Sequence, residues 1–274
     1  MSRAQSTTVG EVEIIALTDG ETEFGKEIFP NADPDKIDAI LKAAGKDTIQ
    51  TNFNAFIVRS GSDVVLVDAG PRDLFGDTCG FLPKAMEEAG VAADDVTHLF
   101  ITHLHPDHIA GAITADGQPI FANATMLVGE EDHAFWAGDS FADETMSQWQ
   151  GLAQAFLNAY AANTEQFSGE SEIVKGMWSQ HLPGHTPGHY GFRIDGGRAG
   201  FMHVGDIAHA QHLQFADPTI GTAFDVDSGT AEKTRKSVLD MVATDGLLFS
   251  GGHMLKPKFG HLSRDGGGYA FEAE

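Results

Sequence analysis

Short apolar runs alternate with polar stretches along most of the chain. Each run is about four to eight residues long, is rich in Val, Ile, Leu or Phe, and is bounded by turn-forming residues, a pattern typical of β-strands. The segment 59–63, which contains Gly61 and lies between two such runs, indicates a hairpin. We expect strands at residues 12–18, 53–58, 64–67, 96–101, 125–128, 178–182, 190–194, 201–204 and 247–250.

Four other segments have the periodicity or the end signals of α-helices. They are residues 34–44, 81–89, 143–160 and 230–242. Asp33 is a candidate N-cap for the first helix, and Gly45 follows its last residue. One face of the third helix is apolar, and core packing is the expected role of that face. The residues of this face are Met146, Trp149, Ala153, Phe156 and Leu157.

Strands and helices interleave from end to end, and nothing in the composition marks a linker. The chain has 274 residues, of which 42% are hydrophobic, enough to bury a substantial core. We therefore expect a single domain spanning residues 1–274. Its class is mixed α and β, and a four-layer arrangement with two sheets inside and helices outside would bury all the strands.

Charge and composition exclude several classes of function. The formal net charge of −23 disfavours nucleic acid and anionic membrane surfaces, which need a basic footprint. Residues 1–10 are polar and lack the apolar region of a signal peptide, and no apolar run approaches the roughly 20 residues that span a bilayer. A cytoplasmic protein is the expectation. With Cys79 as the only cysteine, neither an intrachain disulfide nor a cysteine-ligated structural zinc site is available.

The histidines are concentrated after the strand expected at 96–101. His103, His105, Asp107 and His108 stand within six residues of one another. Four ligands so close together do not easily serve one tetrahedral ion, but they can be divided between two adjacent ions on opposite sides of a tight loop. Pro106 stiffens this loop by fixing its own φ.

Three later segments have the same local plan. In each, a strand leads into a glycine-containing turn that presents a side chain able to bind metal, and these side chains are His185, Asp206 and His253. A single histidine carries little weight, but four such segments in order predict a metal centre. Imidazole and carboxylate ligands suit zinc, and also iron, manganese or cobalt. Asp206 can bridge two ions because a carboxylate has two oxygens.

The run from His103 to His108 matches the HxHxDH signature of the metallo-β-lactamase superfamily. With His185, Asp206 and His253 following in order, the chain resembles this superfamily from about residue 53 to residue 271. Within it, the sequence is similar to methyl parathion hydrolase and its relatives, with acyl-homoserine lactonases as the next relatives. The resemblance implies an αββα sandwich with the metal ions at one edge, between its two halves.

The resemblance also implies how the ligands are shared. His103, His105 and His185 would bind one metal ion, whereas Asp107, His108 and His253 would bind the other. Asp206 would bridge the pair. Two divalent ions, with zinc expected, are the implied cofactors. Asp68 matches another element of the family and is a candidate to orient a ligand histidine from behind.

The implied activity is hydrolysis by a hydroxide that bridges the two ions. The hydroxide would attack a carbonyl carbon or phosphorus, and Asp107 would accept its proton. Esters, lactones or phosphotriesters of small, neutral substrates are the expected targets, since the charge of −23 repels polyanions. The candidates for the substrate pocket are Phe135, Trp136, His209 and Phe224. The family branch further implies a homodimer.

Two alternatives within the same fold remain open. A di-iron oxidoreductase is one, although no flavin domain is attached and the second ligand carboxylate of such sites is absent from the His103 motif. A non-catalytic metal-binding protein is the other, although such proteins usually lose ligands and all seven are present here.

Overall fold

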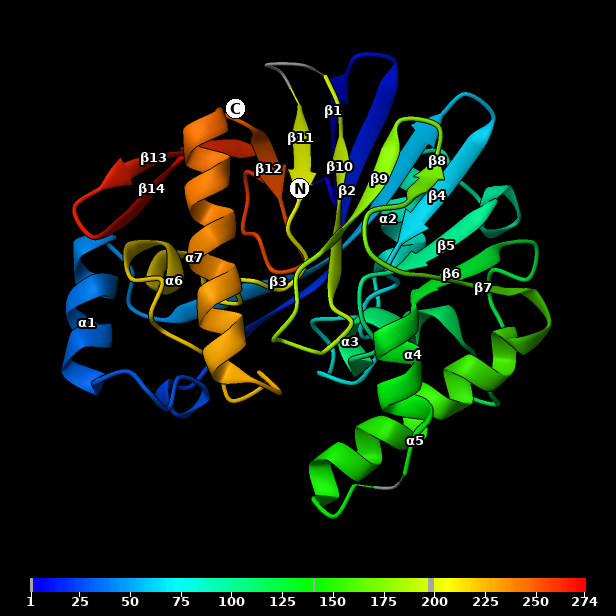
Figure 1. Ribbon diagram of the computed structural model, residues 1–274, viewed down its shortest axis with the longest axis horizontal. Coiled ribbons are helices and arrows are strands. Elements are labelled where there is room, and N and C mark those ends of the chain that lie inside the picture. Colours follow the sequence, from blue (N-terminus) through cyan, green and yellow to red (C-terminus); the bar gives the residue numbers. More distant parts are fainter. Residues whose placement is uncertain (1, 140, 197–199) are drawn as a thin grey trace.

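The computed structural model describes residues 2–139, 141–196 and 200–274, which form two seven-stranded sheets flanked by helices (Figure 1). The first sheet follows the order of the chain: β1 (Ala4–Val9), β2 (Val12–Phe24), β3 (Ile49–Ser60), β4 (Asp63–Val67), β5 (His98–Ile101), β6 (Thr125–Gly129) and β7 (Thr164–Phe167). The second sheet also follows it: β8 (Glu172–Val174), β9 (Met177–His181), β10 (Tyr190–Ile194), β11 (Phe201–His203), β12 (Leu248–Ser250), β13 (Gly260–Asp265) and β14 (Gly268–Ala273). The helices are α1 (Pro34–Ala43), α2 (Leu82–Glu88), α3 (Pro106–Ile109), α4 (Glu130–Ala137), α5 (Glu144–Tyr160), α6 (Gln211–Ala216) and α7 (Ser228–Asp245).

Successive residues of the central strands enter different cores, because side chains along a strand point alternately to its two faces. On β3, Ile57 packs beneath helices α2 and α5, whereas Phe56 packs between the two sheets. On β12, Leu248 joins the core between the sheets and Phe249 packs under α7. Three cores therefore separate four layers, and the expected αββα sandwich of mixed α and β class is confirmed.

Every strand and helix expected from the pattern is present, with ends that shift by up to six residues, the most for β2. The hairpin expected at 59–63 is the turn between β3 and β4. Asp33 caps α1, since its carboxylate accepts a hydrogen bond from the Asp35 N–H at 2.8 Å. The sequence pattern missed β1, β7, β8, β13, β14, α3, α4 and α6.

The two sheets bring several strand ends to one edge. In the first sheet β4 and β5 run parallel, so the residues that follow both strands lie together. In the second sheet β11 and β12 are also parallel, and they deliver Asp206 and His253 in the same way. The segments after these strands, and the loop between β9 and β10, carry all seven residues of the expected metal centre. Among the described residues, no helix is long and apolar enough to span a bilayer.

Candidate metal centre

Three histidines from two loops form the first cluster. His103 and His105 follow β5, and His185 lies in the loop between β9 and β10. All three are buried, and their ligand atoms lie within 4.8 Å of one another. The Nε2 atoms of His103 and His185 are 3.2 Å apart, and Nε2 of His105 has no hydrogen-bond partner. Three imidazole nitrogens thus converge on one point, as an ion requires.

The second cluster combines two carboxylates with two imidazoles, from Asp107, His108, Asp206 and His253. Nε2 of His108 lies 3.1 Å and Nε2 of His253 lies 2.9 Å from Oδ2 of Asp206. Both imidazole nitrogens are also 3.5 Å from Oδ2 of Asp107. Asp107 is the more accessible carboxylate, since its side chain is 16% exposed and that of Asp206 is 1% exposed.

Asp206 stands between the clusters. Its Oδ2 is 3.8 Å from Nε2 of His103 and 3.6 Å from Nε2 of His185, in addition to its contacts in the second cluster. Its Oδ1 is buried and has no hydrogen-bond partner. A buried carboxylate oxygen without a hydrogen-bond partner destabilises the folded protein unless a cation binds to it. The residues therefore fit two adjacent cations that share Asp206.

Three of these histidines form a hydrogen bond to an oxygen acceptor through Nδ1, the ring nitrogen that points away from the clusters. Nδ1 of His108 lies 2.8 Å from Oδ2 of Asp68, Nδ1 of His185 lies 2.9 Å from Oδ1 of Asp225, and Nδ1 of His253 lies 2.8 Å from the Asn52 carbonyl oxygen. An acceptor at Nδ1 takes its proton and leaves Nε2 free to bind metal. The structure thus places Asp68 where the sequence suggested, behind a ligand histidine.

Two buried basic side chains, Arg235 and Lys258, hold the loops that carry these groups. Arg235 of α7 donates to the Ile207 carbonyl at 2.5 Å, and its guanidinium lies 3.4 Å from Asp225. Lys258 donates to the Met254 carbonyl, next to His253 in the chain, at 2.7 Å. Sequence analysis missed Asp225, Arg235 and Lys258. Asp225 and Arg235 lie 40 and 28 residues from His185 and Ile207, and no motif marks Lys258, although it is only four residues from Met254.

The electrostatics divide the histidines into two kinds. Burial holds the pKa of His103 and of His105 well below the usual value, so both are neutral and ready to bind a cation. Burial also opposes protonation of His108, but the carboxylates of Asp206, Asp68 and Asp107 outweigh it and raise the pKa of His108 well above the usual value. The carboxylates of the second cluster therefore favour positive charge at this point, as a site for a metal cation requires.

A cavity of about 150 Å³ opens beside both clusters. Its lining combines residues of the clusters with aromatic rings and is made of Phe24, Phe53, Phe75, His105, Pro106, Asp107, Trp149, Asp206, His209, Phe224 and His253. His209 presents Nε2 3.4 Å from Oδ2 of Asp206, and its ring stacks on His253 with centroids 4.6 Å apart. Phe75 is 44% exposed and stacks on Phe53, which places it at the mouth.

The structure corrects three expectations about aromatic residues. Phe135 and Trp136 are not among the described residues that line the cavity. Trp136 is fully buried behind the His105 ring, and Phe135 packs against Trp136 and Phe141. Trp149, expected only in the core, also lines the cavity. Periodicity shows which residues share a helix face, but it does not show which of these residues lie next to the cavity.

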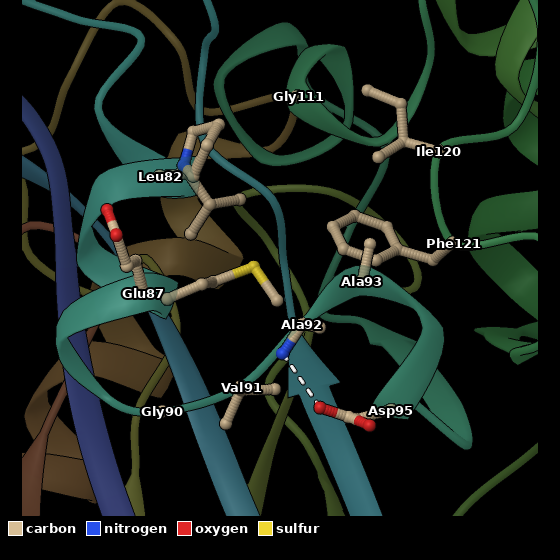
Figure 2. Close-up of a pocket in the computed structure, with 12 residues that line it drawn as sticks. Leu82, Glu87, Gly90, Val91, Ala92, Ala93, Asp95, Gly111, Ile120 and Phe121 are labelled. Atoms are coloured by element: carbon tan, nitrogen blue, oxygen red, sulfur yellow. Dashed lines mark hydrogen bonds between the residues drawn. The ribbon is translucent and has the colours of Figure 1, made fainter.

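A larger cavity of about 500 Å³ lies elsewhere, between α2 and the segment 111–121 (Figure 2). It is lined mainly by apolar side chains, such as those of Leu82, Val91 and Phe121, and shares no lining residue with the cavity beside the clusters. Asp95, at its rim, turns toward the backbone N–H of Ala92 (Figure 2). Because no histidine lines it, this cavity is not the site of the metal chemistry.

Comparisons with known proteins agree with this geometry. A family model described as the metallo-beta-lactamase superfamily matches residues 51–253. An N-acyl homoserine lactonase from Bacillus cereus is 22% identical over 224 residues, which are 75% of this chain and 82% of that protein. Among solved structures, AidC, a dizinc quorum-quenching lactonase in complex with a product, is 26% identical with a TM-score of 0.93, over 100% of this chain and 98% of that chain. The hydrolase AbOPH matches over the same shares, at 26% identity and a TM-score of 0.92.

Proposed function

Because the chain belongs to the metallo-β-lactamase superfamily, we propose that it is a dinuclear metal-dependent hydrolase that opens lactones. The observation that carries the proposal is the convergence of seven metal-binding side chains on two adjacent points beside a cavity. The family match and the neighbouring dizinc lactonase support a hydrolase with two divalent metals. Zinc is the proposed metal, since it suits imidazole and carboxylate ligands and is named for that neighbour.

The proposed ligand sets are those of the two clusters. His103, His105 and His185 would hold one ion, Asp107, His108 and His253 would hold the other, and Asp206 would bridge them. Bound there, the two ions would lower the pKa of a water molecule and polarise the carbonyl oxygen of the substrate.

Side chains of the protein would transfer the proton, bind the substrate and orient the histidines. Asp107 is the accessible carboxylate at the cavity wall, so it can accept the proton of the attacking water and return it to the leaving oxygen. His209 can hydrogen-bond to a substrate oxygen, because its ring lines the cavity without belonging to the seven. Asp68 and Asp225 keep their histidines oriented, so the clusters need little rearrangement during the reaction.

The cavity favours a compact, neutral group. At about 150 Å³ it is smaller than the roughly 300–1,000 Å³ of many ligand sites, so it suits a reacting ring with any tail left at the mouth. The rings of Phe24, Phe53, Trp149 and Phe224 offer apolar walls for such a group. An acyl-homoserine lactone has this form and is named for the bacterial relatives, so we place it first among the substrates.

Other substrates differ in what they require of the site. Simple carboxyl esters present the same electrophilic carbonyl and would be cleaved by the same groups. Phosphotriesters would be slower side substrates. Polyanions should be poor ones, since the net charge of −23 repels them on approach.

A panel of four substrates tests the proposal: an acyl-homoserine lactone, an aryl ester, an aryl phosphotriester and a chromogenic β-lactam. The zinc-loaded protein should turn over the lactone fastest, with the ester next. Fast turnover of the β-lactam alone would contradict the substrate class. Failure to turn over any of the four would contradict the proposed activity and leave only the fold and the clusters.

We also propose that the protein is cytoplasmic and forms a homodimer. The homodimer is implied by the resemblance to the methyl parathion hydrolase and acyl-homoserine lactonase branch. Sedimentation at micromolar concentration should show twice the mass of one chain, and a monomer would contradict the proposal.

A further inference from the structure

Helix α4 presents a buried carboxylate to two of the ligand-bearing loops. Asp132 is fully buried, its Oδ2 accepts a hydrogen bond from the Leu104 N–H at 2.7 Å, and its Oδ1 accepts one from the Gly188 N–H at 3.3 Å. Leu104 lies between the two histidines of the first loop, and Gly188 follows His185 in the second. One carboxylate therefore ties together the two loops that build the first cluster.

The contact between α4 and the second loop is close. A Cβ added to Gly188 would lie 2.2 Å from the backbone nitrogen of Asp132, so a glycine is needed there. One helical turn after Asp132, Trp136 packs edge-on against the His105 ring with centroids 5.6 Å apart. Residues four apart share a face of a helix. One face of α4 thus supports the first cluster at two points.

The charge of Asp132 has no cation among its hydrogen-bond partners. Its partners in the described residues are the uncharged backbone N–H groups of Leu104 and Gly188 and the side chain of Thr186, and burial raises the pKa of Asp132 to about 6. Burying a charged carboxylate without a neighbouring cation destabilises the folded protein. A positive charge near Asp132 would offset this effect. A divalent ion on His105 and His185 would supply that charge, since both loops that Asp132 binds carry ligands of this ion.

We propose that Asp132 is the positioning residue of the first metal ion. It fixes the loop of His105 relative to the loop of His185, and it adds a negative charge that favours a dication between them. This inference rests on the proposed dinuclear function. It extends the role of α4 from a packing element to a part of the metal centre.

The test is a cobalt titration of the metal-stripped protein, followed by the visible absorption of each bound ion. Asp132→Asn keeps the shape of the side chain but removes its charge and turns an amide donor toward one backbone N–H. We expect one of the two cobalt affinities to fall by about 10- to 100-fold, as for other groups behind metal ligands, while the other stays within about threefold. Glu130→Gln is the matched control, because it makes the same charge change on an exposed residue of the same helix and should change neither affinity.

Unchanged affinities in Asp132→Asn, or an equal fall in both, would overturn the proposal. If Asp132→Asn does not fold, Asp132→Glu keeps the charge and displaces it by one methylene group, and it should bind the first ion more weakly than the unmodified protein. Equal binding by that variant, or its failure to fold without metal, would assign Asp132 a purely structural role. If the unmodified protein itself does not bind two ions, the dinuclear function fails instead, and the two failures are distinguishable.

Discussion

At the residue scale, the two halves of the sandwich orient their histidines in the same way. Asp68 follows β4 of the first sheet and faces His108, whereas Asp225 lies in the second half and faces His185. Both carboxylates are buried. The His185 imidazole and the Arg235 guanidinium hold the pKa of Asp225 below its usual range, against the effect of burial. The Asp225 carboxylate is therefore charged and acts as a fixed acceptor. For Asp68 the balance differs, since burial raises the pKa of this carboxyl against the opposing effect of His108.

Replacing Asp225 with Asn should weaken metal binding in the His103, His105 and His185 cluster. The amide can still meet Nδ1 of His185, but it carries no charge to strengthen the imidazole as a ligand. We expect a loss of affinity of about 10- to 100-fold, measured by competition with a chelator. Asp245→Asn, at the exposed end of α7, is the control. An unchanged affinity in Asp225→Asn would show that Asp225 only packs.

Asp206 and His209 should separate metal binding from turnover. Asp206 faces both clusters, so Asp206→Asn should reduce the bound metal to about one ion or fewer per chain. His209→Asn should keep both ions and lower kcat by about tenfold, the equivalent of one hydrogen bond to a charged group. Metal analysis and lactone kinetics on both variants provide the comparison. Equal metal content and equal activity in the two variants would contradict the bridging role of Asp206.

At the element scale, sequence pattern predicted the long and buried elements best. Strands β4 and β5 each contain an apolar run, Val64–Val67 and Leu99–Ile101, and α5 has a clear stripe ending in Phe156 and Leu157. Helix α4 was missed because its eight residues begin with Glu130, Glu131 and Asp132 and show little amphipathic character. The hairpin of β13 and β14 was missed because its partly exposed strands mix polar and apolar residues.

The candidate site was predictable where a motif is local and not where it depends on packing. The seven proposed ligands follow strands with recognisable turns, so these positions could be predicted from the sequence. Asp225 and Asp132 reach the clusters only because α7 and α4 are packed there, and no local spacing records that packing. For the same reason the predicted roles of Trp149 and Trp136 are reversed in the structure. Trp149 lines the cavity and Trp136 packs against His105, because helix placement decides which ring faces the cavity.

Two aromatic residues of helix α5, Phe156 and Trp149, should differ in whether their replacement affects stability or substrate binding. Phe156 is fully buried, so Phe156→Ala should cost about 3–5 kcal/mol in the free energy of unfolding. Trp149 is half-buried at the cavity, so Trp149→Ala should cost less stability and should raise the KM for a lactone severalfold. Thermal unfolding and lactone kinetics measure the two effects. A KM unaffected by Trp149→Ala would remove this ring from the substrate site.

At the scale of the whole molecule, the acidic charge is spread along the chain. The 40 acidic and 17 basic residues give a net charge of −23, and the mutual repulsion of carboxylates destabilises the folded state. Added salt screens this repulsion. The melting temperature should therefore rise as monovalent salt increases from low to molar concentration. A flat response would show that the acidic charge does not limit stability.

The central claim is that the two halves of the sandwich together hold two metal ions on seven side chains. Its most direct test is the metal content of the purified protein, measured together with lactone hydrolysis as metal is removed by a chelator and then restored. The account predicts about two ions per chain in the active protein, loss of hydrolysis on removal, and recovery with zinc or manganese. Full activity with one ion per chain, or with none, would contradict it.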